Sequence, residues 1–195
     1  SRGEATTTTI ETGYNAPHTP SHWPDESLHS RTGQSEDSCV NATNGSTAKR
    51  ECFLATIEAV DTEIGNLLAT MNQEQLANTV IFYLSDNGTS PFVRDQNVFA
   101  SGEAKATLYE GGMRVPMVVS GKNVTRKGAT EVRRVNIVDL YATIADVAEV
   151  DTQQIYDSLS FIDYLSEEDG ELRRYNYTDC QADNVDGWTI RNTNR

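Results

Sequence analysis

Apolar residues recur along this chain with helical spacing in two long segments. Over residues 50–71 they fall three and four positions apart, which predicts an amphipathic helix with one face on a core. Residues 136–150 repeat the pattern and predict a second helix. The expected inner stripe of the first helix is Phe53, Ile57, Val60, Ile64, Leu67, Leu68 and Met71. That of the second is Ile137, Leu140, Tyr141, Ile144 and Val147, with Asp139 and Asp146 facing out.

Shorter apolar runs predict strands between and after these helices. Residues 79–84 are all β-branched, aromatic or otherwise apolar, and such a run is typical of a buried strand. Residues 114–121 predict a second strand, with Pro116 at its entry. A weaker strand is expected at 175–178. Because the first helix leads through a tight link into a buried strand, the order favours half of a right-handed crossover unit, as in α/β proteins.

Two segments read as loops. Residues 25–48 are polar and without periodicity, which predicts a surface loop or insertion that is a candidate for facing the substrate. Residues 14–24 are punctuated by three prolines, which hold the backbone extended and would keep His18 in one place. Residues 1–10 are rich in Thr and predict an edge strand or a loose end.

The strand over 79–84 ends at Ser85-Asp86-Asn87-Gly88, a cluster of turn-forming residues. In open α/β sheets, ligands bind just beyond the carboxyl ends of the strands. A carboxylate from Asp86 beside the amide carbonyl of Asn87 suits a hard divalent cation such as Ca²⁺ or Mg²⁺. Taken alone, these residues are more simply explained as a turn.

Three segments in order give this turn a functional context. They are Tyr-Asn-Ala-Pro-His-Thr-Pro at 14–20, the Ser-Asp-Asn-Gly turn, and a stretch from Lys105 through Tyr-Glu-Gly-Gly to Pro116. This set resembles the sulfatase family of the alkaline-phosphatase-like superfamily, whose pattern is His-x-Pro, then a strand ending in Ser-Asp-Asn-Gly, then Lys-x-x-x-Tyr-Glu-Gly-Gly-x-Arg-x-Pro. The resemblance runs from about residue 14 to 191 and is most specific over 79–116.

The resemblance implies a fold and a domain organisation. The fold would be an α/β three-layer sandwich, with a mostly parallel sheet between helices. Residues 1–195 would form the C-terminal part of the catalytic domain, and 171–195 would begin its C-terminal subdomain. Residues 187–191 resemble the start of the family's late strand.

The resemblance also implies a role for each matching residue. Asp86 and Asn87 would be ligands of a divalent cation, usually Ca²⁺. Lys105 would place a point charge on the sulfuryl oxygens, and His18 would donate to an oxygen or protonate the leaving group. Outside this context a lysine or a loop histidine is more often a solvated surface group. Glu110 and Arg114 are interpreted as a local structural pair.

A nucleophile is missing from the sequence. In the family it is a formylglycine made from Cys or Ser in a Cys/Ser-x-Pro/Ala-x-Arg motif, which none of Cys39, Cys52 and Cys180 matches. We therefore expect the nucleophile and the remaining metal ligands upstream of Ser1, and no activity from this chain alone.

The expected reaction is hydrolysis of a sulfate ester, on a small molecule or a sulfated glycan, to alcohol and sulfate. Two alternatives stay open. One is a phosphonate or phosphodiester hydrolase or a phosphoethanolamine-type transferase of the same superfamily. The other is a non-catalytic sulfatase-like protein that binds a sulfated glycan.

Charge and cysteine content limit the classes of partner and the cellular compartments that fit this protein. Sixteen basic and 29 acidic residues give a net charge of −13, which argues against a nucleic-acid-binding protein. No apolar run reaches the roughly 20 residues that span a bilayer. Cys39 and Cys52 could close a small disulfide loop, although spacing alone leaves the pairing open. The resemblance implies a secreted, periplasmic or lysosomal-type compartment.

Overall fold

The computed structural model shows two compact units within one chain. The structure describes residues 13–14, 17–18, 20–152, 156–167, 170–182 and 185–192. We call the unit containing residues 77–85 and 116–192 the sheet unit, and the unit containing 13–76 and 86–115 the helical unit. No helix in the described ranges is long and apolar enough to cross a membrane.

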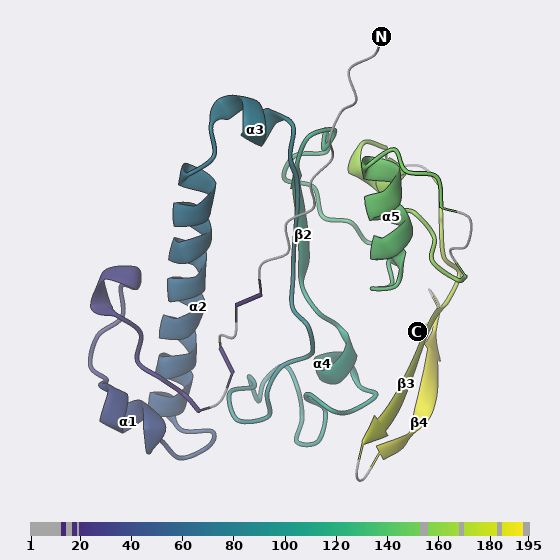
Figure 1. The fold of residues 1–195 in the computed structure, drawn as a ribbon. Coiled ribbons are helices and arrows are strands. Elements are labelled where there is room, and N and C mark those ends of the chain that lie inside the picture. Colours follow the sequence, from purple (N-terminus) through teal and green to yellow (C-terminus); the bar gives the residue numbers. More distant parts are fainter. Residues whose placement is uncertain are drawn as a thin grey trace. The chain divides into compact units, whose positions relative to one another are not determined.

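The helical unit is dominated by α2 (Thr47–Ala69), which confirms the helix predicted over residues 50–71 (Figure 1). Its first turn is capped by Ser46, whose hydroxyl accepts from the Lys49 N–H at 3.1 Å. The expected inner stripe is wrong in part, because Ile57 and Leu67 are exposed. The buried positions are Lys49, Cys52, Ala55, Ala59 and Val60. Small side chains on this face allow neighbouring segments to approach closely.

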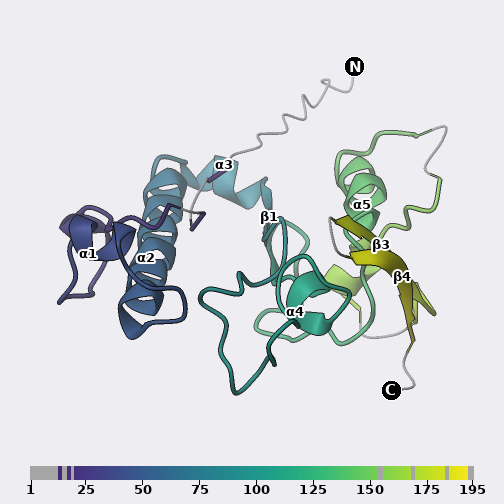
Figure 2. The ribbon, with the colours of Figure 1, turned by 90° about the horizontal axis from the view of Figure 1, so that it is seen from below.

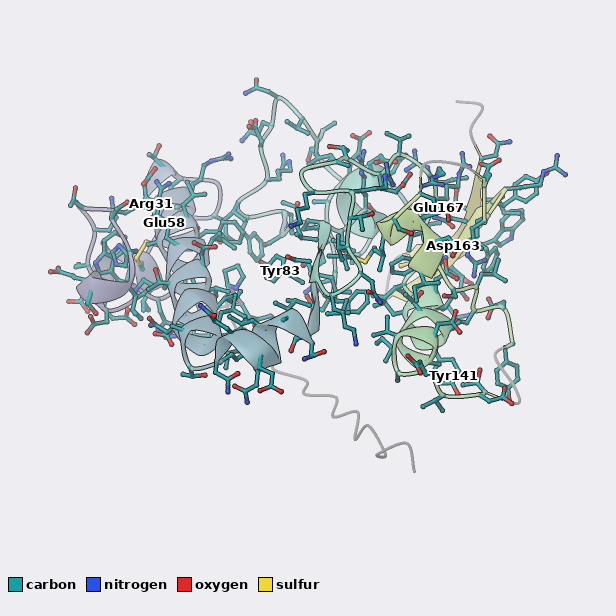
Figure 3. All side chains as sticks on the ribbon, turned by 90° about the horizontal axis from the view of Figure 1, so that it is seen from above. Arg31, Glu58, Tyr83, Tyr141, Asp163 and Glu167 are labelled. Atoms are coloured by element: carbon teal, nitrogen blue, oxygen red, sulfur yellow. A yellow bond between two sulfur atoms is a disulfide. The ribbon has the colours of Figure 1, made fainter. Side chains whose placement is uncertain are left out.

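Residues 25–48, expected to be a surface loop, contain two short helices, η1 (Glu26–Leu28) and α1 (Glu36–Val40). A disulfide between Cys39 and Cys52 joins α1 to α2. Arg31 lies beside Glu58 in Figure 3, with nitrogen–oxygen distances of 2.8 Å to Glu58 and 2.7 Å to Glu51. This segment is therefore fastened to α2 covalently and by ion pairs.

Two further helices complete this part of the chain. α3 (Gln73–Ala77) follows α2 directly, and α4 (Glu110–Met113) follows the Lys105 segment (Figure 2). At the start of α3, the Asn72 side chain accepts from the Gln75 N–H and the Gln75 side chain accepts from the Asn72 N–H, both at 2.9 Å. This reciprocal pair satisfies donors that a helix start leaves unpaired.

In the sheet unit, β1 (Val80–Leu84) and β2 (Met117–Gly121) confirm the two predicted central strands. They pair antiparallel, with Val80 opposite Gly121 and Leu84 opposite Met117. Gly121 has a φ of +108°, and a Cβ there would lie 2.1 Å from the Thr79 carbonyl oxygen, so this position requires glycine.

A second antiparallel pair joins β3 (Asn176–Ala182) to β4 (Val185–Arg191), at the two places where strands were expected. Both sheets of the described residues have two strands, and both are antiparallel. The expected mostly parallel sheet is not seen in that part of the chain. A parallel partner for β1 would have to come from another strand through a crossover connection.

The sheet unit has a small core around η2 (Ile162–Leu165), in which Phe161, Tyr164 and Leu165 are buried. Side chains packed against them include Phe82, Met117 and Val119 from one face of β1 and β2. On the other face, Tyr83 and Val118 are 42% and 58% exposed. The prediction of a fully buried strand is therefore wrong for β1, which has one packed face.

The second predicted helix is confirmed as α5 (Asp139–Val147), but its expected orientation is wrong. Asp139, assigned to the outer face, is fully buried, whereas Tyr141, assigned to the inner stripe, is 57% exposed. The cause is a set of hydrogen bonds, because the Asp139 carboxylate accepts from the Arg173 guanidinium and from the Leu159 N–H.

Candidate functional site

All four predicted site residues belong to the helical unit. Asp86 and Asn87 follow β1 after one residue, where the extended chain turns. Asp86 is exposed and Asn87 is half-buried. Within the described residues, the Asp86 carboxylate has no hydrogen-bonding or ion-pair partner. It is therefore available to a cation from solution.

Residues 86–89 form a loop, called here the Asp86 loop. Backbone hydrogen bonds connect this loop to Lys105. The Lys105 N–H donates to the Thr89 carbonyl at 2.8 Å, and the Thr89 N–H donates to the Gly111 carbonyl at 2.8 Å. Thr89 thus links two segments that the sequence places about 16 and 22 residues further on. The structure brings the Asp86 loop, the Lys105 turn and α4 into one backbone cluster.

Glycine is what allows these backbones to touch. A Cβ on Gly88 would lie 2.2 Å from the Gly111 carbonyl oxygen and 2.4 Å from that of Gly112. A Cβ on Gly112 would lie 2.3 Å from the Thr107 carbonyl oxygen. Separations this short exclude any side chain at Gly88 and Gly112.

Lys105 sits in a tight turn with an unusual backbone. Ala104 is buried, and its carbonyl accepts from the Thr107 hydroxyl at 2.7 Å. Ala106 has a φ of +66°, a left-handed conformation that costs a residue with a Cβ roughly 1 kcal/mol. The Lys105 side chain is half-exposed, and its ammonium has no hydrogen bond or ion pair within the described ranges. The turn is held by contacts on both sides of Lys105 and leaves its charge unneutralised.

His18 is exposed in the proline-rich segment. Its neighbours Asn15, Ala16 and Thr19 lie outside the described residues. Its placement beside Lys105 therefore stays a prediction from the sequence.

Glu110 and Arg114 form the local pair that was predicted from the sequence. Glu110 opens α4, and an Arg114 guanidinium nitrogen is 3.5 Å from its carboxylate. Arg114 is largely exposed, so this contact contributes at most about 0.5 kcal/mol. The Arg114 N–H also donates to the Glu110 carbonyl at 2.9 Å and ends the helix.

The donor set suits part of a hard-cation site. Asp86 and Asn87 offer a carboxylate and an amide oxygen, whereas Ca²⁺ takes roughly six to eight oxygen ligands. The described residues contain no group of three or more His, Cys, Asp and Glu side chains placed to hold a metal ion. These two residues fit as a partial ligand set that other oxygens must complete.

Comparison with known proteins identifies the family to which the chain is similar. The family model described as Sulfatase matches residues 11–150. "Arylsulfatase J" of Mus musculus is 33% identical over 101 residues, covering 51% of this chain and 17% of the relative. "N-acetylglucosamine-6-O-sulfatase" of Bacteroides thetaiotaomicron is 33% identical over 100 residues, covering 51% and 17%. The chain thus spans about a fifth of the length of its curated relatives.

The chain also resembles a solved structure in its fold. A solved structure of a protein in complex with its substrate D-glucosamine-2-N,6-O-disulfate is 26% identical, with a TM-score of 0.60 over 73% of this chain and 29% of that one. The family match covers the Asp86 loop, the Lys105 turn and α4. On this match, the chain belongs to the sulfatase family.

Proposed function

We propose that the protein hydrolyses a sulfate ester to an alcohol and sulfate, and that this chain supplies Lys105, His18, Asp86 and Asn87 to the reaction. Membership of the sulfatase family supports sulfate-ester chemistry. The observation that carries the proposal is the backbone link through Thr89 between the Asp86 loop and Lys105. It fixes the Lys105 backbone to Thr89, a residue three positions after Asp86.

Lys105 would contact the non-bridging sulfuryl oxygens. Negative charge builds on the ester oxygens as the bond to sulfur breaks, and a fixed ammonium stabilises that charge more than it stabilises the ground state. The half-buried turn around Ala104 limits the backbone movement that would otherwise be needed. His18 would donate a hydrogen bond to the sulfuryl group or a proton to the leaving alcohol.

Asp86 and Asn87 would hold a divalent cation, Ca²⁺ or Mg²⁺, as two of its oxygen ligands. When bound, such an ion would neutralise part of the sulfate charge. The remaining ligands and a formylglycine nucleophile would come from residues outside these 195. Cys39 and Cys52 are occupied by their disulfide, and Cys180 lies in β3 without the surrounding motif.

A sulfated amino sugar is the substrate we would test first. One relative carries the name N-acetylglucosamine-6-O-sulfatase, and the solved structure that resembles this chain holds a disulfated glucosamine as its substrate. The Cys39–Cys52 disulfide supports an oxidising location, such as a secreted, periplasmic or lysosomal-type compartment.

The test uses the complete gene product that contains this chain. Turnover is measured on an aryl sulfate and on glucosamine 6-sulfate, with the matching phosphate monoester and a phosphodiester as comparison substrates. We expect sulfate-ester turnover to exceed phosphate-ester turnover. Lys105→Ala should lower kcat by on the order of a hundredfold or more. Lys127→Ala is the matched control, because Lys127 is an exposed lysine of the sheet unit.

Three results would count against the proposal. Near-normal turnover in the Lys105→Ala protein removes Lys105 from the site. Faster hydrolysis of the phosphate substrates favours a phosphoesterase of the same superfamily. Tight binding of a sulfated glycan without turnover favours a non-catalytic binder.

A further inference from the structure

Asparagines in Asn-x-Ser/Thr sequences, the acceptor pattern for N-linked glycans, occur several times in the chain. They are Asn41, Asn44, Asn87, Asn123 and Asn176. In the structure, some of these asparagines have amide groups that are hydrogen-bonded or enclosed, whereas others have amide groups exposed to solvent. This property is independent of sulfate-ester chemistry.

Three of the five asparagines are engaged or enclosed. The Asn176 amide donates to the Val135 carbonyl at 3.1 Å, and its Oδ1 is buried. The Asn41 amide donates to the Asp37 carbonyl at 2.9 Å, at the end of α1. Asn87 is half-buried and precedes Gly88, where a Cβ would lie 2.2 Å from the Gly111 carbonyl oxygen. A glycan on any of these would crowd a contact that holds the local fold.

The other two asparagines lie in exposed turns. Asn44 belongs to the connection between α1 and α2, and Asn123 follows β2 with a φ of +66°. The connection between α1 and α2 can be followed in Figure 1. Neither amide has a side-chain hydrogen bond in the described part of the chain. A substituent on either nitrogen would extend into solvent without breaking a contact.

The surroundings of Asn44 add a second observation. The connection is closed by the Cys39–Cys52 disulfide, and the Gly45 N–H donates to the Phe92 carbonyl at 2.9 Å. Structural disulfides form in oxidising compartments, which in eukaryotic cells include the one where N-linked glycans are added. The exposed turn and its disulfide therefore suit the same environment.

We propose that Asn44 and Asn123 accept N-linked glycans and that Asn41, Asn87 and Asn176 do not. In the reaction, the amide nitrogen forms a bond to C1 of an oligosaccharide carried on a lipid diphosphate. The bond between C1 and the diphosphate oxygen breaks, and the amide gives up one proton as the lipid diphosphate leaves. The glycosylated asparagine and the released lipid diphosphate together account for all atoms of the two reactants.

The test secretes the complete gene product that contains this chain from a eukaryotic cell line behind a cleavable signal peptide. Intact mass is compared before and after treatment with peptide N-glycosidase, which converts each glycosylated asparagine to aspartate and marks the site for peptide mapping. Asn44→Gln and Asn123→Gln should each remove one glycan, and the double variant should carry none within residues 1–195. Asn41→Gln and Asn176→Gln are matched controls that should leave the glycan mass unchanged.

Translation of the same variants into isolated microsomes gives a second readout if the secreted protein is retained by the cells. The proposal is overturned if a control glycoprotein is modified in the same system while Asn44 and Asn123 are not. It is equally overturned if a glycan maps to Asn41, Asn87 or Asn176.

Discussion

Asp139, in the first turn of α5, is fully buried and pairs with Arg173, which lies 34 residues further along the chain. The Arg173 Nε donates to one carboxylate oxygen at 2.7 Å, and a second guanidinium nitrogen donates to the other. Backbone N–H groups of Asn136 and Leu159 also donate to the carboxylate, at 2.8 and 2.9 Å. The hydrogen bond to Asp139 raises the pKa of Arg173. One buried side chain thus fastens three separate segments of the sheet unit.

Arg173→Met should destabilise the chain strongly, because it leaves the Asp139 carboxylate buried without its cation. Breaking such a pair costs about 3–5 kcal/mol, which is measured as the change in unfolding free energy from urea denaturation. Arg174→Met, at the exposed next position, is the control and should change stability by less than about 0.5 kcal/mol. A loss below about 1 kcal/mol in Arg173→Met would show that the pair is solvated.

This pair also explains what the sequence could and could not predict. Helical and strand periods depend on neighbours along the chain, so α2, α5, β1 and β2 were predictable from local pattern. Which face of α5 is buried depends on Arg173, whose position relative to Asp139 has no local signal. Periodicity therefore assigned Tyr141 to the core and Asp139 to solvent, whereas the structure has the reverse.

The candidate site also contains some residues that could be predicted from the sequence and others that could not. Asp86, Asn87 and Lys105 were recognisable because their residue types and order carry the family pattern. Thr89 and Ala106 were not, because they contribute backbone hydrogen bonds and a left-handed φ rather than side-chain chemistry. At Gly88 the backbone lies so close to the Gly111 and Gly112 carbonyls that no side chain fits, a contact between segments more than 20 residues apart that no local pattern shows.

Glu131 should make the stability of the chain sensitive to acid. Side-chain hydrogen bonds from Arg133 are the main cause that lowers its pKa from 4.5 to about 2, and Arg126 adds a further hydrogen bond. Because the folded state binds the proton less tightly than the unfolded state, this stabilisation is complete above about pH 4.5. It is lost as the pH falls through about 2.

Glu131→Gln should therefore lower the unfolding free energy by about 2–3 kcal/mol at pH 6 and by little near pH 2. The measurement is a series of denaturant titrations between these two pH values. Glu26→Gln serves as the control, since Glu26 is exposed and its carboxylate has no partner in the described residues. A gap between wild type and Glu131→Gln that stays constant with pH would refute this assignment.

Loss of the Cys39–Cys52 disulfide should weaken the attachment of α1 to α2. The bond joins residues 13 positions apart, and closing a loop of this size stabilises a protein by roughly 3 kcal/mol through the unfolded chain. We expect Cys39→Ala/Cys52→Ala and the reduced wild type to unfold at similarly lowered denaturant concentrations. Cys180→Ser should leave the effect of reductant unchanged, because Cys180 is a free thiol. Two additional reactive thiols in the unreduced wild type would contradict the pairing.

Alanine at two glycines should change stability in opposite directions. In Gly88→Ala the new Cβ would lie 2.2 Å from the Gly111 carbonyl oxygen, so the Asp86 loop must move away from α4, at a cost of about 1–3 kcal/mol. Gly65 lies exposed within α2, and a methyl group added there would have no other atom within 4 Å. Gly65→Ala should therefore stabilise the helix by about 0.5–1 kcal/mol.

The unfolding free energies of Gly88→Ala and Gly65→Ala show directly which substitution destabilises the chain and which stabilises it. The complete gene product adds a second readout, because moving the Asp86 loop displaces Thr89 and, through it, the Lys105 backbone. Gly88→Ala should then reduce sulfate-ester turnover, whereas Gly65→Ala should leave it unchanged. A Gly88→Ala protein with wild-type stability and turnover would mean that the loop and α4 are not packed together as this structure has them.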